Sequence, residues 1–312
     1  MVHVLDHPNI IRLRLVESVR EGPSGQNTTW DLCDAGSLDQ LMQKEGQGLP
    51  EPLIWYTLIS LTRAVHWLQT GLVDPNAEPP DRQPAPGWRP AAHDYMSPGW
   101  KPVVHNLINP ANIFYRRSLD PDSAHGICQL GNFSRCVVLD DLAQASSVLP
   151  LHVESERTGY EAPELGSYDP YDGILGSRSD IWSIGAVCFA MMTGRTIWDF
   201  VMQLDIDAKR PARKDEDWRT VPPPEIHERL RAVLNGYRLS IELPKQYSTN
   251  LQTSVEWLIS LDPARRDVRA MASFAETSYQ IHLLELKTPE LKEMVYDMAT
   301  GELILPSGSI GG

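Results

Sequence analysis

The chain has 312 residues, 42% of them hydrophobic, which is enough for one large domain or two small ones with a buried core. A formal net charge of -13 argues against non-specific binding to nucleic acid and to anionic membrane surfaces. The four cysteines have neither paired nor metal-ligand spacing, and no apolar run reaches the roughly 20 residues that span a bilayer. We therefore expect reduced thiols and a cytoplasmic or nuclear location, with no nucleic acid and no membrane among the partners.

In chain order, short strands are predicted first and helices afterwards. Residues 52–68 have apolar side chains at helical spacing, with Pro52 near the start, and predict a long amphipathic helix. Residues 73–102 are rich in Pro, Gly, Asp and Arg, and predict an insertion without regular structure that is either mobile or partner-binding. Three prolines, 222–224, predict a loop before a helix from about Glu225 to Leu234. Residues 306–312 predict a frayed end.

Five segments between residues 103 and 266 bear most directly on function. They are Val103–Phe114 (VVHNLINPANIF), Leu130–Ser134 (LGNFS), Tyr160–Glu164 (YEAPE), Ser179–Gly185 (SDIWSIG) and Leu261–Arg266 (LDPARR). In order and spacing they resemble the catalytic loop, the D-F-G motif, the end of the activation segment, the buried central helix and the late L-D-P-x-x-R motif of eukaryotic protein kinases. The resemblance implies an α+β, protein-kinase-like fold with a mainly α-helical large lobe.

The same resemblance implies that the reactive groups have been replaced. In the family, an Asp accepts the substrate proton, a Lys neutralises the transferred phosphoryl group, and an Asn and a second Asp hold metal ions. These places are Leu107, Asn109, Asn112 and Asn132 here. Leucine cannot accept a proton and an amide carries no charge, so no intact catalytic or metal site is expected. His105 is expected to brace the loop by packing.

Three further residues are expected to be structural. By the resemblance, Asp180 hydrogen-bonds the main chain of the catalytic loop, and Glu164 and Arg266 form the buried ion pair that anchors the activation segment. Asn106 replaces the family arginine that pairs with a phosphate on that segment, and Arg157 replaces a threonine that contacts the catalytic residues. These residues are thus expected to stabilise or regulate the fold and not to carry out phosphoryl transfer.

The beginning of the chain resembles part of a kinase small lobe. Leu5–Leu13 is similar to the segment that enters the fourth strand, and Asp31–Leu38 is similar to the hinge, in which Asp31, Leu32 and Cys33 would give weak contacts to adenine. Trp30 occupies the gatekeeper place. The family's glycine-rich loop, strand lysine and helix glutamate would lie further upstream, so we expect a truncated small-lobe sheet and at most weak binding of ATP and Mg²⁺.

The expected domains are a small-lobe remnant with the hinge over residues 1–33, a large lobe over 34–285 and a C-terminal extension over 286–312. The segment from Leu239 to Leu258 is most similar to NIMA-related serine/threonine kinases. Three functions remain open: an inactive pseudokinase that binds a protein partner or acts allosterically, an ATP-dependent kinase that uses displaced residues such as Asp140 or Asp141, and a truncated fragment without function. The loss of three functional groups together favours an inactive chain.

Overall fold

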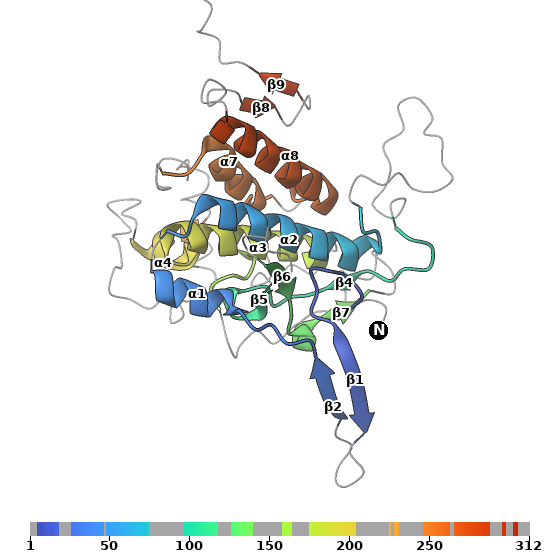
Figure 1. Cartoon of the computed structure of the whole chain (residues 1–312). Coiled ribbons are helices and arrows are strands. Elements are labelled where there is room, and N and C mark those ends of the chain that lie inside the picture. The colour runs from blue at the N-terminus through green and yellow to red at the C-terminus, as the bar shows by residue number, and fades with distance from the viewer. Residues whose placement is uncertain are drawn as a thin grey trace, which may run out of the picture.

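The computed structural model describes residues 5–18, 26–46, 48–74, 96–117, 126–139, 158–163, 175–203, 225, 228–230, 246–262, 265–287, 295–297 and 302–304. Within these residues a helical body is combined with short antiparallel sheets (Figure 1). The fold class is therefore α+β, as the sequence predicts.

The long helix α2, Glu51–Thr70, lies at the centre of the helical body. It begins after Pro50 and has Pro52 in its first turn, where the missing N–H would have no helical partner. It ends at Gly71, whose φ of 69° is left-handed. The helix predicted over residues 52–68 is confirmed, with one more residue at its start and two more at its end.

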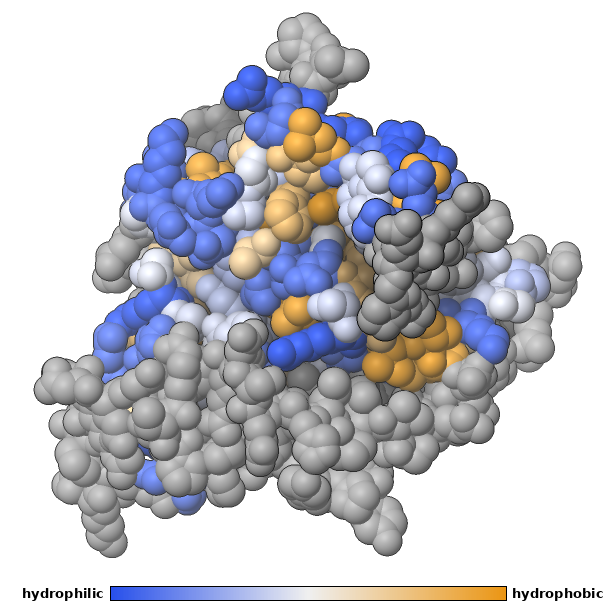
Figure 2. Space-filling model, turned by 90° about the horizontal axis from the view of Figure 1, so that it is seen from below, coloured by the Kyte–Doolittle hydropathy of each residue, from blue (hydrophilic) through white to orange (hydrophobic). Residues whose placement is uncertain are grey.

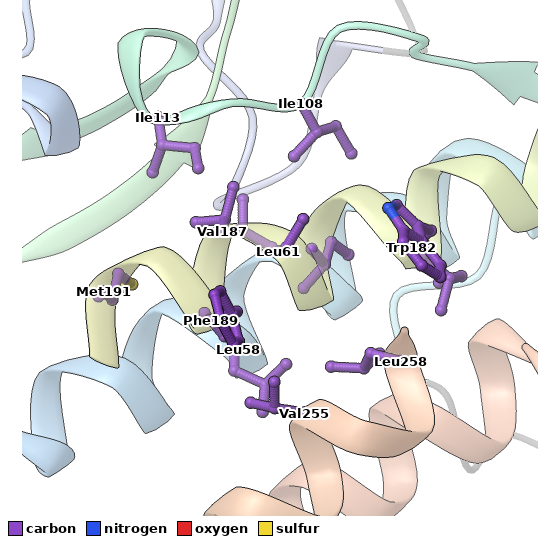
Figure 3. Packing of buried hydrophobic residues seen from close by; sticks show 14 of the residues in the cluster. Leu58, Leu61, Ile108, Ile113, Trp182, Val187, Phe189, Met191, Val255 and Leu258 are labelled. Atoms are coloured by element: carbon purple, nitrogen blue, oxygen red, sulfur yellow. The ribbon is translucent and has the colours of Figure 1, made fainter. Parts of the chain in front are cut away.

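Helix α2 packs against α3, Leu175–Thr193, and α8, Val268–Lys287, while α3 also packs against α7, Thr249–Leu258. Residues 181–192 of α3 are all buried, which explains why this helix is apolar on every side. Side chains from these helices form one hydrophobic cluster (Figure 3), which Ile108 joins from a neighbouring loop and Ile113 from the strand that follows this loop.

Within the described part of the chain, no single helix has the length and apolar composition needed to cross a bilayer. Helix α3 from Arg178 meets those criteria only together with α4, Ile197–Gln203, and these two helices are bent by 63° at the break between them. Their apolar side chains belong to the buried cluster.

The strands that precede α3 form small sheets on one side of the helices (Figure 1). Strands β1, Leu13–Ser18, and β2, Gln26–Trp30, make a ribbon that projects from the body (Figure 1). Strand β5, Ile113–Arg116, pairs with β3, Gly36–Ser37, on one side and with β6, Ile127–Leu130, on the other. Strand β4, Val103–Val104, pairs with β7, Val137–Val138. The last two sheets hold both ends of the predicted catalytic loop.

The remaining described elements are short. Helix α1, Leu38–Glu45, begins with a capping box between Ser37 and Gln40. Two short 3-10 helices, η3 over Pro110–Asn112 and η4 over Phe133–Arg135, follow the predicted loops. Strands β8, Val295–Asp297, and β9, Glu302–Ile304, form a hairpin that the sequence did not predict.

Some predictions lie partly or wholly outside the described residues. Helical backbone is present at Glu225 and residues 228–230, whereas residues 231–234 of that predicted helix are not described. In the insertion, residues 73–74 and 96–102 contain neither helix nor strand, and residues 75–95 are not described. The predicted frayed end, residues 306–312, is also outside the described part.

Candidate functional site

The candidate site is the loop between β4 and β5, and Asp180 of α3 holds this loop through hydrogen bonds to its main chain. The two carboxylate oxygens of Asp180 accept hydrogen bonds from the main-chain N–H groups of His105, at 2.8 Å, and Asn106, at 2.9 Å. Burial raises the pKa of Asp180 to about 7, although these two hydrogen bonds act in the opposite direction. Both carboxylate oxygens point at the main chain, so this acid holds the loop and is not presented to a ligand.

His105 connects the loop to the segment that carries Asn132. Its Nε2 donates to the carbonyl of Gly131 at 3.0 Å, and its Nδ1 accepts from the N–H of Leu107 at 3.3 Å. Burial lowers the pKa of His105 to about 4, so the ring is neutral at pH 7 with its proton on Nε2. Phe133 packs edge-on against the ring at a centroid distance of 4.9 Å. A ring fixed by both nitrogens supports the structural role that the resemblance implies.

Two asparagines in the site have a left-handed backbone. Asn106 has φ 60° and Asn132 has φ 61°, which asparagine tolerates better than most residues. The Asn106 amide donates to the carbonyl of Arg135 at 3.3 Å, and so it connects the loop between β4 and β5 to η4. Position 106, where the kinase resemblance leads one to expect an arginine, thus carries an uncharged side chain that hydrogen-bonds the main chain of η4.

The predicted metal positions, Asn112 and Asn132, are hydrogen-bonded to each other. The amide of Asn132 donates to Oδ1 of Asn112 at 3.0 Å, and the amide of Asn112 donates to the carbonyl of Leu107 at 2.9 Å. Oδ1 of Asn132 accepts from the hydroxyl of Ser134 at 2.7 Å. Both side-chain oxygens that could face a cation thus already accept hydrogen bonds.

The other two predicted positions add no charge. Asn109 caps η3, since its Oδ1 accepts from the N–H of Ala111 at 3.1 Å. Leu107 is half-buried beside it and presents a hydrocarbon side chain. Among the described residues there is also no cluster of three or more His, Cys, Asp or Glu that could hold a metal ion. The structure brings the predicted positions together as a neutral, hydrogen-bonded group.

A carboxylate that the sequence analysis did not single out organises the neighbouring segment. Glu161 accepts from the N–H groups of Thr158, at 2.7 Å, Gly159, at 2.9 Å, and Tyr160, at 3.1 Å, and also from the Thr158 hydroxyl. Three successive N–H groups converging on one anion form a nest. Glu161 lies inside the Y-E-A-P-E motif, but nothing in its residue type distinguishes a nest anion from an exposed acid.

A cavity of about 10 Å³ lies between this nest and the loop, and it has room for about one water molecule. It is too small for a nucleotide or a peptide side chain. Its lining residues come from the loop, the nest segment and α3: Asn106, Leu107, Ile108, Thr158, Tyr160, Glu161, Ser179, Asp180 and Ser183.

The hinge-like residues follow β2 at the base of the ribbon. The carboxylate of Asp31 forms an ion pair with Arg14 and accepts from Arg116 at 3.4 Å. The hydrogen bond from Arg14 lowers the pKa of Asp31. The Cys33 thiol lies 3.6 Å from Oε1 of Gln129, and burial raises its pKa. Leu32 is 78% exposed. Two of the three hinge side chains are thus engaged within the protein and the third faces solvent.

Arg266, the predicted anchor of the activation segment, is buried. Arg266 donates to the carbonyl of Ser260 at 2.7 Å and to that of Arg178 at 3.4 Å, and its guanidinium lies 4.9 Å from the ring centre of Trp182. Glu164 lies outside the described residues, and so do Arg157, Asp140 and Asp141. The predicted ion pair therefore stays a prediction.

No protein-family profile matches the chain. Serine/threonine-protein kinase ATG1b of Arabidopsis thaliana is 26% identical over 192 residues, which are 62% of this chain and 20% of that protein. A probable serine/threonine-protein kinase of Dictyostelium discoideum is 27% identical over 110 residues, which are 35% of this chain and 12% of that protein. Serine/threonine-protein kinase 16 of Mus musculus is 31% identical over 78 residues, a quarter of each chain.

Each of these matches spans a quarter or less of the curated relative. All three relatives are named as serine/threonine kinases, and the fold is compatible with that class. Parts of the chain are thus similar to parts of serine/threonine kinases, and this similarity supports a protein-kinase-like domain.

Proposed function

We propose that this kinase-like domain is a pseudokinase, which transfers no phosphoryl group and acts as a protein-interaction or allosteric module inside the cell. The observation that carries the proposal is the 3.0 Å hydrogen bond between the amide of Asn132 and Oδ1 of Asn112. At these two positions a kinase places a carboxylate and an amide around a metal ion. Mg²⁺ is bound mainly by carboxylates and phosphates, and two amides joined by one hydrogen bond give it no anionic ligand.

The lost proton acceptor supports the same proposal. Leu107 stands where the family has its catalytic Asp, and the buried Asp180 accepts from the main chain on both oxygens. Removing one electrostatic group from an active site commonly costs about 10²- to 10³-fold in rate. Here the proton acceptor, the phosphate-neutralising lysine and the metal carboxylate are all replaced, whereas the structural contacts of His105 and Asp180 remain.

The proposal also covers the parentage of the domain and its partner. The NIMA-related parentage depends on residues 239–258 alone, and the names of the relatives above give it no support.

A protein partner is favoured by exposed apolar side chains on and next to the β1–β2 ribbon, namely Leu15, Val16, Trp30 and Leu32. Figure 2 views the molecule from the side toward which this ribbon points, and separate hydrophobic areas lie there among hydrophilic ones.

The experiment is a phosphoryl-transfer assay on the purified chain with radiolabelled ATP, in Mg²⁺ and in Mn²⁺, using a general protein substrate. We expect no transfer to the substrate or to the chain itself. Isothermal titration should give ATP binding weaker than about 1 mM that Mg²⁺ does not strengthen. Stoichiometric autophosphorylation that disappears in Asp140→Ala or Asp141→Ala would instead support a kinase that uses displaced residues.

A further inference from the structure

The C-terminal end of α2 carries a notch that one tryptophan fills. The notch consists of Trp67, Leu68 and Gly71, and its occupant is Trp100 from the far end of the insertion. The Trp100 ring lies 4.9 Å from that of Trp67 at 61°, and its indole N–H donates to the carbonyl of Leu68 at 3.1 Å. A Cβ atom at Gly71 would lie 2.5 Å from the Trp100 ring, so the absence of a side chain there makes room for the indole.

A tight turn presents Trp100 to this notch. The N–H of Trp100 donates to the carbonyl of Ser97 at 3.0 Å, with Pro98 and Gly99 between them and Gly99 at φ 74°. Proline followed by a left-handed glycine is the pattern of a type II turn. The N–H of Ser97 also donates to the carbonyl of Thr70 at 2.8 Å, which joins the turn to the end of α2.

The docked pentapeptide, Pro98–Pro102, has a near copy twelve residues earlier. Pro86–Pro90 reads Pro-Gly-Trp-Arg-Pro, and Pro98–Pro102 reads Pro-Gly-Trp-Lys-Pro. The two agree at four positions and have a basic residue at the fifth. The earlier copy therefore has every residue type that the docked one uses: proline and glycine for the turn, and tryptophan for the notch.

We propose that the notch is a recognition site for the peptide Pro-Gly-Trp-(Arg/Lys)-Pro, and that Pro86–Pro90 of the same chain is its second occupant, in exchange with Pro98–Pro102. With the later copy docked, residues 72–97 connect Gly71 to the turn. With the earlier copy docked, residues 72–85 precede it and residues 91–102 lead on to β4. Both connections exceed ten residues, and closure entropy changes only slowly with such lengths.

The exchange would alter how the chain enters β4 and the loop between β4 and β5. In the observed arrangement, Trp100 is held three residues before β4, and the carbonyl of Pro102 accepts from the N–H of Leu139 at 2.8 Å. If Trp88 takes the notch, the chain before β4 loses its tie to α2. The insertion would thus have two docked states, and only one of them fixes the segment that leads to Val103 and His105.

The first test uses the full chain with both tryptophans removed, W88A/W100A, and a synthetic peptide of residues 85–90 that contains 5-fluorotryptophan. We expect saturable binding in ¹⁹F NMR. Replacing the peptide glycine by L-alanine should weaken binding about tenfold, because the left-handed conformation becomes unfavourable, while D-alanine should be tolerated. Absence of saturation, or equal binding of a peptide with alanine in place of tryptophan, would overturn the proposal.

The second test needs no empty notch and so covers the case in which the double variant does not fold. The whole chain is labelled with 5-fluorotryptophan, and the resonances of Trp88 and Trp100 are assigned with W88F and W100F. In W100F, we expect the Trp88 resonance to move to the position of the docked indole. An unchanged Trp88 resonance contradicts the exchange, and a shift that appears only with concentration assigns the peptide to a second copy and contradicts docking within one chain.

Discussion

The side chains of Asn132 and Asn112 are joined by a hydrogen bond from amide to carbonyl oxygen at 3.0 Å, across the place where a kinase would hold a metal ion. Asn112 is buried, whereas Asn132 is exposed at the edge of the site. An aspartate at position 132 could not donate this hydrogen bond. If position 132 corresponds to the metal-binding aspartate of kinases, the asparagine takes the place of a metal ligand, and its amide satisfies the side-chain oxygen of Asn112.

We predict that Asn132→Asp makes the chain sensitive to divalent metal. Two acceptor oxygens would then face each other, which should cost about 1 kcal/mol of the free energy of unfolding without metal. Mg²⁺ could relieve this, because the site would regain a carboxylate. Thermal denaturation with and without millimolar Mg²⁺ should show metal stabilisation of this variant and none of the parent chain.

Asn109→Asp is the matched control for this prediction. It makes the same change of charge in the neighbouring loop between β4 and β5, but the Asn109 side chain accepts from the N–H of Ala111, and a carboxylate can accept that hydrogen bond equally well. Its melting should not respond to Mg²⁺. If the parent chain and both variants respond alike, the metal acts elsewhere and the interpretation of the Asn112–Asn132 pair is wrong.

Local sequence signals predicted the parts of the fold that depend on neighbouring residues. Helix α2 was found because its apolar spacing and Pro52 both lie within the element. The pairing of Val103 with Val138 and the β8–β9 hairpin were not predicted. A two-residue strand leaves no periodic pattern, and its stability comes from a partner distant in the sequence.

The site was predicted at the level of positions but not of contacts. The kinase resemblance singled out Asn112 and Asn132, yet their mutual hydrogen bond depends on how two loops approach each other. Glu161 was missed as the anion of a nest, because its partners are main-chain N–H groups, which leave no mark in the sequence. Trp100 was likewise assigned to an irregular insertion, and its docking on α2 became visible only in the structure.

We predict that Arg266→Ala strongly destabilises the fold. The guanidinium is buried, donates to the carbonyls of Ser260 and Arg178, and packs on Trp182. Its removal leaves buried acceptors without a donor and should lower the free energy of unfolding by about 3 kcal/mol. Arg265→Ala is the control, because Arg265 is exposed and its ion pair with Asp262 is also exposed. Equal urea midpoints for the two variants would contradict a structural role for Arg266.

We predict that stability falls as the pH is lowered from about 6.5 to 4. Burial lowers the pKa of His7 and of His105 to about 4, so between these pH values the unfolded chain binds protons that the folded chain does not. Each histidine should contribute a slope of about 1.4 kcal/mol per pH unit within this window. Urea denaturation at several pH values measures the sum.

His105→Gln separates one histidine from the total. A glutamine amide can donate to Gly131 and accept from Leu107 without titrating. The slope of the free energy of unfolding against pH should therefore fall by about 1.4 kcal/mol per pH unit between pH 6.5 and 4. Asp180 acts in the opposite direction: burial raises its pKa to about 7, and its stabilising contribution is present below about 3.8 and lost as the pH rises toward 7. An unchanged slope in the variant would mean that His105 already titrates normally in the folded chain.

We predict that the cost of Gly71→Ala depends on Trp100, whereas the cost of Gly46→Ala does not. Both glycines end helices with a positive φ, 69° and 78°, so alanine costs backbone strain at both places; Gly71 is in the left-handed helical region, where this strain is about 1–2 kcal/mol, and Gly46, with ψ -136°, is outside that region. A Cβ at Gly46 would meet no atom within 4 Å, whereas a Cβ at Gly71 would lie 2.5 Å from the ring of Trp100. Overpacking adds about 1–3 kcal/mol at Gly71 unless the tryptophan leaves. Thermal denaturation of the two variants, alone and combined with Trp100→Ala, decides the question: the excess cost at Gly71 should vanish once Trp100 is removed, and an excess that persists would show that Trp100 does not occupy the notch.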